Sequence, residues 1–331
     1  MRRSRCLMLV LATLPACGQI RGAALWSPHE VISWGTELRI HTLPSGHART
    51  LARGDFGEGG CVATLSGDRG IVVQQGQGLG RLVWLRAPRW RPELIDSGMD
   101  THDCQEADVH GRHGIVVVHR YGQMRFYEPP ARRGEPWPYT EIYSFYTASH
   151  QGGLLQKDVD SDGRLDVLCG DYWIGNPQSF ELGWRLFAIH LWFEEPDSAL
   201  VRIADFGRGV IEAQAHLDNA RLAWLEPAAD IHQQWTQRRL AEDLHLRRIH
   251  GLDAADVDGD GRLDIVAAEN AGPDSRLVLL VNRGEGNFQP RVLAHTAGVV
   301  FLRLLSLEST GQPGIVTAGA DGVHWRKIEN K

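Results

Sequence analysis

The chain has 331 residues, of which 43% are hydrophobic and 23% charged, which is enough apolar material to bury a core in one or two domains. Its formal net charge of −6 argues against a nucleic-acid partner held through phosphate contacts, because such contacts require a basic surface. The 37 glycines and 11 tryptophans favour an all-β repeat protein built from glycine-containing turns and aromatic strands.

The N-terminus has the pattern of an export signal. Three arginines among the first five residues precede an apolar run that is too short to span a bilayer. Two processing sites fit. The motif L-P-A-C ending at Cys17 resembles a bacterial lipobox and would place a lipid anchor on Cys17, whereas ordinary cleavage near Ala23 or Ala24 would release a soluble protein. We expect a signal peptide over 1–23 and one domain over 24–331, located in the periplasm, at the cell surface or outside the cell.

Three cysteines follow the signal region, an odd number that cannot pair completely within the chain. Cys61 and Cys104 occupy nearly matching places in adjacent repeats, so a bridge between them is compatible with the sequence but not required by it. Cys169 follows apolar residues in a predicted strand, and we expect it to be a buried packing residue.

A repeat of 43 to 55 residues runs through most of the chain. Its anchor is the residue that opens a short apolar strand, the second of each repeat. These anchors are Gly70, Gly114, Asp166, Gly209, Asp264 and Gly314. A partial copy at 30–34 precedes them and brings the total to seven. Periods of this size are typical of propellers and arrays, so we predict a seven-bladed β-propeller, with six or eight blades as alternatives.

A third strand also recurs within each repeat, and it often carries an aromatic residue. The predicted third strands are Arg81–Leu85, Arg125–Pro129, His190–Glu194, Arg221–Pro227, Arg276–Leu280 and Val323–Arg326. The spacings from Gly209 to Arg221 and from Asp264 to Arg276 are both 12 residues. We interpret the aromatics as packing between blades.

Propellers commonly close their ring by pairing strands from the two chain ends. The first repeat lacks an obvious first strand. We therefore expect the region 24–49 to lie beside the last repeat, near 301–331, with strands of the two regions paired.

Two repeats contain the pattern Asp-x-Asp-x-Asp-Gly-x-x-Asp. The carboxylates are Asp158, Asp160, Asp162 and Asp166 in one copy, and Asp256, Asp258, Asp260 and Asp264 in the other. Carboxylates at this density repel one another unless a cation neutralises them, and hard oxygen ligands suit calcium. Arg164 and Arg262, at position 7, would contribute their backbone carbonyls and leave their side chains free. The alternative is an acidic turn without metal.

The two copies differ from an EF-hand, because position 12 is Cys169 or Ala267 where that motif needs glutamate. They resemble the FG-GAP or VCBS repeat of integrin-alpha-like β-propellers. This resemblance implies that each loop joins the first and second strands of a blade and holds calcium. We predict two structural calcium ions.

One connection between predicted strands is unusually long and aromatic. It begins near Gly170 and includes the ligand-binding candidates Tyr172, Trp173, Phe180 and Trp184. Exposed aromatics in a loop stack on sugar rings or anchor a protein partner. The alternative is that these side chains pack over the rim of the propeller itself.

Histidines precede several predicted first strands. They are His102, His150 and His250, with His295 placed more loosely. Imidazoles that converge near the axis of a propeller would bind a transition metal or act as acid and base. The alternative is scattered rim histidines bonded to backbone carbonyls.

The sequence contains no nucleophile elbow, paired-cysteine zinc motif or dinucleotide fingerprint. The leading hypothesis is therefore an exported, monomeric binding or adhesion module, stabilised by calcium, with a carbohydrate or extracellular protein as partner. The alternative is an enzyme, a polysaccharide lyase or sugar dehydratase whose catalytic histidines would be His102, His150 and His250 in the funnel.

Overall fold

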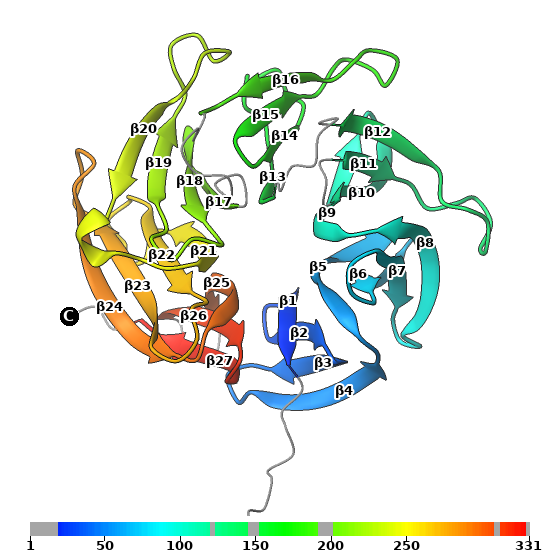
Figure 1. Cartoon of the computed structure of the whole chain (residues 1–331), viewed down its shortest axis with the longest axis horizontal. Helices are drawn as coiled ribbons and strands as arrows, with labels where there is room; N and C mark the ends of the chain where they lie inside the picture. The colour runs from blue at the N-terminus through cyan, green and yellow to red at the C-terminus, as the bar shows by residue number, and fades with distance from the viewer. Residues whose placement is uncertain (1–18, 120–122, 145–151, 191–200, 308–311, 329–331) are drawn as a thin grey trace, which may run out of the picture.

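The computed structural model describes residues 19–119, 123–144, 152–190, 201–307 and 312–328. Within these residues the strands form seven antiparallel sheets arranged as blades around a central axis (Figure 1). In every sheet the strands follow one another in chain order, so each blade is a simple meander. The predicted seven-bladed β-propeller is confirmed.

The strand bounds of the first four blades are as follows. Blade 1 contains β1 (Ile20–Ser27), β2 (Glu30–Gly35), β3 (Glu37–Thr42) and β4 (His47–Arg53). Blade 2 contains β5 (Phe56–Leu65), β6 (Asp68–Gln75), β7 (Gly80–Arg86) and β8 (Arg91–Met99). Blade 3 contains β9 (Thr101–Val109), β10 (Arg112–His119), β11 (Gln123–Tyr127) and β12 (Tyr139–Ser144). Blade 4 contains β13 (Leu154–Lys157), β14 (Asp166–Cys169), β15 (Tyr172–Gly175) and β16 (Arg185–Ala188).

The remaining three blades complete the ring. Blade 5 contains β17 (Val201–Phe206), β18 (Gly209–Gln214), β19 (Leu222–Glu226) and β20 (Thr236–Leu240), followed by the short 3-10 helix η1 (Glu242–Leu244). Blade 6 contains β21 (Ile249–Ala255), β22 (Asp264–Glu269), β23 (Ser275–Asn282) and β24 (Phe288–Thr296). Blade 7 contains β25 (Val299–Leu307), β26 (Gln312–Gly319) and β27 (Gly322–Lys327). Among the described residues, no helix is long and apolar enough to cross a membrane.

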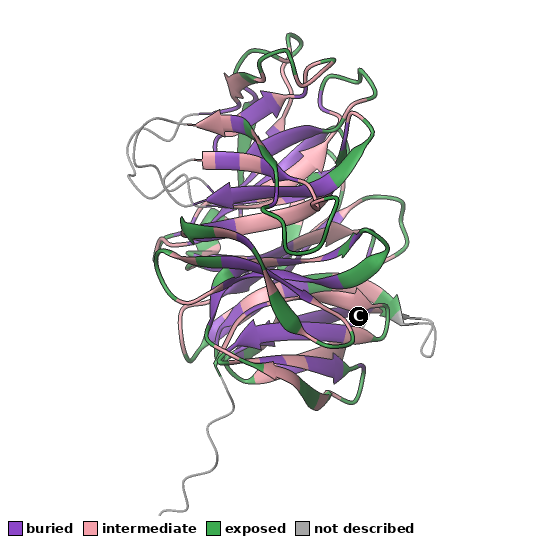
Figure 2. Ribbon diagram, turned by 90° about the vertical axis from the view of Figure 1, so that its right-hand side faces the viewer, coloured by how far each residue is buried: buried purple, intermediate pink, exposed green. Residues whose placement is uncertain are grey.

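The core lies between the blades. The described residues form seven hydrophobic clusters, and each cluster joins two neighbouring blades around the ring. Figure 2 shows the result, with buried segments along the strands and exposed segments in the turns at both faces. Because strands alternate their side chains, the second and third strands of a blade contribute to the clusters on both sides.

The second-strand anchors fit the structure in every repeat, since each lies within or opens the second strand of its blade. The predicted third strands are also correct in blades 2, 3, 5, 6 and 7. Blade 4 is the exception. Its third strand is β15, immediately after β14, and the predicted segment 190–194 begins after the fourth strand β16 and continues outside the described residues.

The two ends of the chain meet as predicted, but not by strand pairing. Val31 and Leu43 of blade 1 pack against Val316 and Val323 of blade 7 in one cluster. Within the described residues, β1 hydrogen-bonds to β2 and β27 to β26, so the two blades stay separate sheets. Side-chain packing therefore joins blade 1 to blade 7, and the predicted mixed sheet is wrong.

The first strand of blade 1 begins at Ile20, four residues before the predicted domain boundary at Ala24. Ile20 and Ala23 belong to the cluster that joins blades 1 and 7. The folded domain therefore includes residues that the sequence had assigned to the signal region.

Candidate metal sites and the central cavity

The first Asp-rich loop joins β13 to β14, the first and second strands of blade 4. Asp158 stands at its start and accepts hydrogen bonds from the backbone N–H groups of Asp162, at 3.1 Å, and Gly163, at 3.0 Å. Oxygens of Asp158, Asp160 and Asp166 lie within 4.8 Å of one another. The positive φ of Gly163, 86°, lets the chain turn back at this point.

The second Asp-rich loop joins β21 to β22 in blade 6 and repeats this geometry. Asp256 accepts from the N–H groups of Asp260, at 3.1 Å, and Gly261, at 2.9 Å. Oxygens of Asp256, Asp258 and Asp260 lie within 4.8 Å of one another. The Oδ1 atom of Asp258 is buried and lacks a hydrogen-bond partner within the described part of the chain.

The position-9 aspartates are buried beneath the loops. Asp166 accepts from the N–H groups of Val159, at 3.0 Å, and Asn176, at 2.7 Å, and Asp264 makes the same two bonds in blade 6. Burial raises the pKa of Asp166 to about 6, and Asp160 adds to the rise while the two N–H groups oppose it. Burial likewise raises the pKa of Asp264. These carboxyls tie the loop to the third strand.

The position-7 arginines are not free, contrary to the prediction. The guanidinium of Arg164 pairs with Asp162 and donates through Nε to the carbonyl oxygen of Asn176, at 3.0 Å. Arg262 pairs with Asp260 and donates to Asn282 in the same way, at 2.9 Å. Each arginine neutralises one carboxylate at the edge of its loop. In blade 6 Arg283 also lies 3.4 Å from Asp258, so among the described residues three carboxylates of the blade 4 loop and two of the blade 6 loop lack an arginine partner.

The donor set of both loops fits calcium. All the converging side-chain atoms are carboxylate oxygens, and calcium takes six to eight oxygen ligands. In blade 4 the ligands would come from Asp158, Asp160 and Asp166, and in blade 6 from Asp256, Asp258 and Asp260. The orphaned Oδ1 of Asp258 is an acceptor that such an ion would satisfy.

The long aromatic connection is divided by the strands of blade 4, and only residues 176–184 form a loop, between β15 and β16. Tyr172 and Trp173 lie in β15, and Trp173 is only 1% exposed. Its ring stacks on Phe187 of β16, with centroids 4.6 Å apart. Phe180 stacks on Phe126 of blade 3, at 5.7 Å, and half-buried Trp184 packs against the same cluster. Trp173, Phe180 and Trp184 thus pack against the propeller itself, which agrees with the alternative interpretation.

The candidate histidines divide into three groups. His102 of β9 and His250 of β21 both line the cavity on the propeller axis. His150 lies outside the described residues. His295 lies in β24, the outermost strand of blade 6, and its side chain is exposed, so its expected approach to the funnel is wrong. Burial, with the nearby Arg202 and His216, lowers the pKa of His250 to about 3 and keeps it neutral.

The axial cavity has a volume of about 550 Å³ and is lined mainly by the first strands of the blades. Its charged lining residues carry both signs. They are Arg21, Glu58, Asp103, Arg202 and Arg303. A disulfide joins Cys61 of β5 to Cys104 of β9 at the same wall. Cys169 is a free, fully buried thiol, as predicted.

A further polar cluster escaped the sequence analysis. Asp171 follows β14, His190 follows β16, and Glu212 lies within β18 of the neighbouring blade. One ligand atom of each lies within 4.8 Å of the others, and all three side chains are buried. Burial and the negative charge of Glu212 raise the pKa of Asp171, and His190 opposes the rise. Only the fold brings these three residues together.

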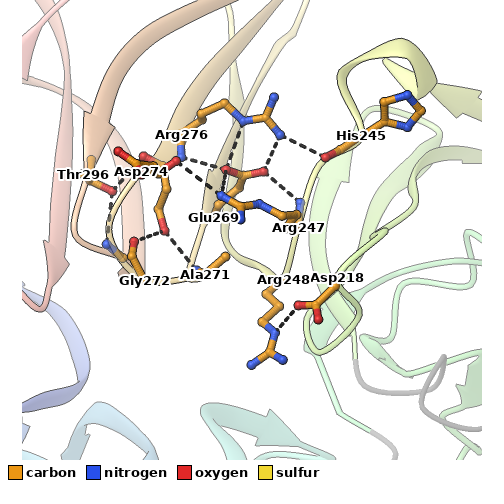
Figure 3. A network of polar contacts seen from close by, with 12 residues as sticks. Asp218, His245, Arg247, Arg248, Glu269, Ala271, Gly272, Asp274, Arg276 and Thr296 are labelled. Carbon is orange, nitrogen blue, oxygen red and sulfur yellow. Dashed lines mark hydrogen bonds and ion pairs between the residues drawn. The ribbon is translucent and has the colours of Figure 1, made fainter.

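Blade 6 also contains a buried carboxylate, but this one is surrounded by hydrogen-bond donors (Figure 3). Glu269, at the end of β22, is 1% exposed and accepts bonds from the N–H groups of Arg247 and Arg276, both at 2.8 Å. The Arg276 guanidinium also donates to it, at 2.6 Å and 3.1 Å. Burial alone would raise the pKa of Glu269, but these donors outweigh burial and lower it.

No protein-family model matches the chain, and no curated protein matches it either. The resemblance to FG-GAP and VCBS repeats therefore stays a prediction. Solved structures do match the fold. Sqt1 of Saccharomyces cerevisiae has a TM-score of 0.56 at 12% identity, covering 95% of this chain and 97% of that one.

Two other propellers give similar values. The WD40 β-propeller domain of Doa1 has a TM-score of 0.57 at 10% identity, covering 96% of this chain and 95% of that one. YCF48 from Cyanidioschyzon merolae has a TM-score of 0.58 at 12% identity, covering 95% and 96%. Identities this low support the β-propeller fold alone.

Proposed function

We propose that this protein is an exported binding module, a propeller whose two Asp-rich loops each hold a structural calcium ion and whose partner is a protein. The observation that carries the proposal is the repetition of one loop geometry in blades 4 and 6. Both loops converge three carboxylate oxygens within 4.8 Å, and both bury their position-9 carboxyl under the turn.

A calcium ion would offset the electrostatic repulsion between the carboxylates of each Asp-rich loop. Like charges this close disfavour the ionised form, and arginines neutralise only part of each loop. Arg164 pairs with one carboxylate in blade 4, whereas Arg262 and Arg283 pair with two in blade 6. A divalent cation would offset the repulsion and hold the turn between the first two strands. Outside the cell calcium is plentiful, so even weak sites stay filled.

The disulfide supports export. Such bonds persist in oxidising compartments and are rare in the cytosol, and Cys61–Cys104 lies on the cavity wall between blades 2 and 3. The arginine-rich start and short apolar run of the sequence point the same way. Periplasm, cell surface and medium are all compatible with this chemistry.

A protein partner fits better than a carbohydrate. The candidate aromatic platform is used for packing, since Trp173 is buried and Phe180 stacks on blade 3. The axial cavity instead presents charged groups of both signs, which suit a polar protein segment. β-Propellers commonly act as protein-interaction modules, and the similar solved folds are consistent with that role.

Calcium titration of the chelator-stripped protein tests the proposal. We expect two calcium ions per chain by calorimetry, one in Asp160→Ala, one in Asp258→Ala and none in the double variant, because each substitution removes one ligand. Calcium should also raise the melting temperature of the wild type. Asp243→Ala, an exposed acidic residue of η1, is the control and should still bind two. Unchanged melting at millimolar calcium would overturn the proposal.

A second candidate function is catalysis in the axial cavity. It is favoured by one observation, that His102 and His250 both line this cavity. Polysaccharide turnover by the purified protein, abolished by His102→Ala or His250→Ala without a lower melting temperature, would support it. Activity that survives the double substitution would exclude these histidines from the reaction.

A further inference from the structure

Two buried carboxylates and one imidazole meet between blades 4 and 5. Glu212 is fully buried, and Asp171 and His190 are each 6% exposed. His190 Nε2 lies 2.8 Å from Glu212 Oε1 and 3.5 Å from Asp171 Oδ1. The imidazole nitrogen therefore stands between the two carboxylates.

The cluster lacks the donors that its carboxylates need. Glu212 Oε2 and Asp171 Oδ1 are buried and accept no hydrogen bond within the described part of the chain. Two carboxylates and one imidazolium would leave one buried negative charge, which is strongly unfavourable unless it is neutralised. The cluster calls for a proton or a cation.

Glu269 shows how the same fold satisfies such a group elsewhere. It ends the second strand of blade 6, and both of its oxygens accept bonds from the backbone or guanidinium of Arg276. No Lys or Arg pairs with Asp171 or Glu212 among the described residues, so the junction of blades 4 and 5 has the buried carboxylates without the guanidinium.

We propose that Asp171, His190 and Glu212 bind one divalent transition-metal ion of the zinc class. One imidazole nitrogen and two carboxylate oxygens are a donor set that zinc accepts, with a fourth position left for water. Bond lengths of about 2.0–2.2 Å would place tetrahedral ligand atoms roughly 3.4 Å apart. The distances of 2.8 Å and 3.5 Å around His190 Nε2 are close to that value.

This site is separate from the calcium loops in place and chemistry. Asp171 lies at the turn between the second and third strands, whereas the Asp-rich loops join first and second strands. In a meander these turns lie at opposite ends of the blade, hence on opposite faces of the ring. The Asp-rich loops offer side-chain oxygens only, while this cluster adds an imidazole.

The test uses the full protein, stripped with chelator and returned to millimolar calcium so that the Asp-rich loops cannot compete. Zn²⁺ and Mn²⁺ are titrated separately by calorimetry, and retained metal is counted by elemental analysis after gel filtration. We expect one equivalent of either ion in the wild type and in the double variant Asp160→Ala/Asp258→Ala. Glu212→Gln and Asp171→Asn should each weaken binding at least tenfold.

Glu212→Gln and Asp171→Asn preserve side-chain shape, and melting curves in calcium report whether they fold. If Glu212→Gln does not fold, Asp171→Asn and the wild-type stoichiometry still decide the matter. Absence of Zn²⁺ and Mn²⁺ uptake by the wild type would mean that a proton alone neutralises the cluster. Equal uptake by the wild type and the folded variants would place the metal elsewhere on the surface. Either result overturns this proposal and leaves the calcium proposal untouched.

Discussion

At the scale of single residues, the buried carboxylate of Glu269 holds the entry of blade 6 in place. Besides binding Glu269, the Arg276 guanidinium donates to the carbonyl oxygens of Leu244, at 2.8 Å, and His245, at 3.0 Å. The connection from η1 to β21 is thus fixed to β22 and β23 through one ion pair (Figure 3). Removing the carboxylate would leave Arg276 partly buried and unpaired.

We predict that Glu269→Gln lowers the free energy of unfolding by about 2 kcal/mol at pH 7. The pKa of Glu269 is lower in the folded state than in the unfolded chain. Its contribution is therefore fully present above the unfolded pKa, about 4.3, and is lost as the pH falls through the folded value. Denaturant titrations should give a constant difference between wild type and variant from pH 5 to 8 and a smaller one below pH 4. A difference that grows in acid would contradict this account.

Of the candidate metal sites, the sequence could predict the two Asp-rich loops but not the cluster of Asp171, His190 and Glu212. The Asp-rich loops were found because their carboxylates lie within nine residues, so spacing alone brings them together. Asp171, His190 and Glu212 come from three separate strands or connections across two blades. Each is an isolated polar residue in the sequence, and only the packing of blade 4 on blade 5 joins them.

At the scale of strands, the recurring glycine and aromatic residue form a packed pair. A Cβ atom at Gly209 would lie 2.1 Å from the carbonyl oxygen of Leu225 and 3.1 Å from the Trp224 indole nitrogen. Gly70 and Gly314 face Trp84 and Trp325 in the same way. At these three positions the third strand lies so close to the second that a side chain larger than glycine's would collide with it.

We predict that Gly209→Ala destabilises the protein by about 1–3 kcal/mol, because the new methyl group would force β18 and β19 apart. Gly183→Ala is the matched control. Nothing lies within 4 Å of a Cβ atom there, so its effect should stay within about 0.5 kcal/mol. Thermal unfolding of both variants measures the contrast, and equal effects would show that the close approach is not the cause.

Strand pairing explains the one misplaced third strand. In blade 4 the second strand turns at once into β15, and Leu168 pairs with Trp173 as Val72 pairs with Trp84 in blade 2. The aromatic residue is at its usual register, but the connection before it is much shorter. The sequence prediction expected a long connection after the second strand, so it passed over β15 and selected the similar apolar and aromatic segment 190–194.

At the scale of the whole molecule, the disulfide between β5 and β9 links two adjacent blades. Its two cysteines are 43 residues apart in the sequence. A loop of that length implies a stabilisation of about 4 kcal/mol through the unfolded chain. We predict that Cys61→Ala/Cys104→Ala loses most of this amount in guanidinium unfolding. The control is Cys169→Ala, which retains the disulfide and should lose only the stability that comes from the packing of the Cys169 side chain. Equal stability of the oxidised wild type and the double variant would refute the prediction.

Closure of the ring depends on the first strand of the chain. Ile20 and Ala23 pack with blade 7, and Arg21 donates to the carbonyl oxygen of Phe56 in blade 2, at 2.7 Å. The innermost strand of blade 1 thus contacts both of its neighbours. Because β27 does not pair with it among the described residues, these side chains, together with Val31 and Leu43, join blade 1 to blade 7.

We predict that a chain beginning at Ala24 is less stable than one beginning at Gly18 by roughly 2–4 kcal/mol, because it loses half of β1 and the partly buried side chains there. Denaturant unfolding of the two chains measures the difference in the free energy of unfolding.

The same argument predicts where an export signal would be cleaved. Cleavage before Cys17 leaves β1 whole, whereas cleavage near Ala23 or Ala24 removes its first residues, so the mature N-terminus should lie ahead of Ile20. If the proposed export takes place, mass spectrometry of the mature protein would give the position of its N-terminus. A mature protein that starts at Ala24 and unfolds at the same denaturant concentration as the longer chain would show that the ring closes without the start of β1.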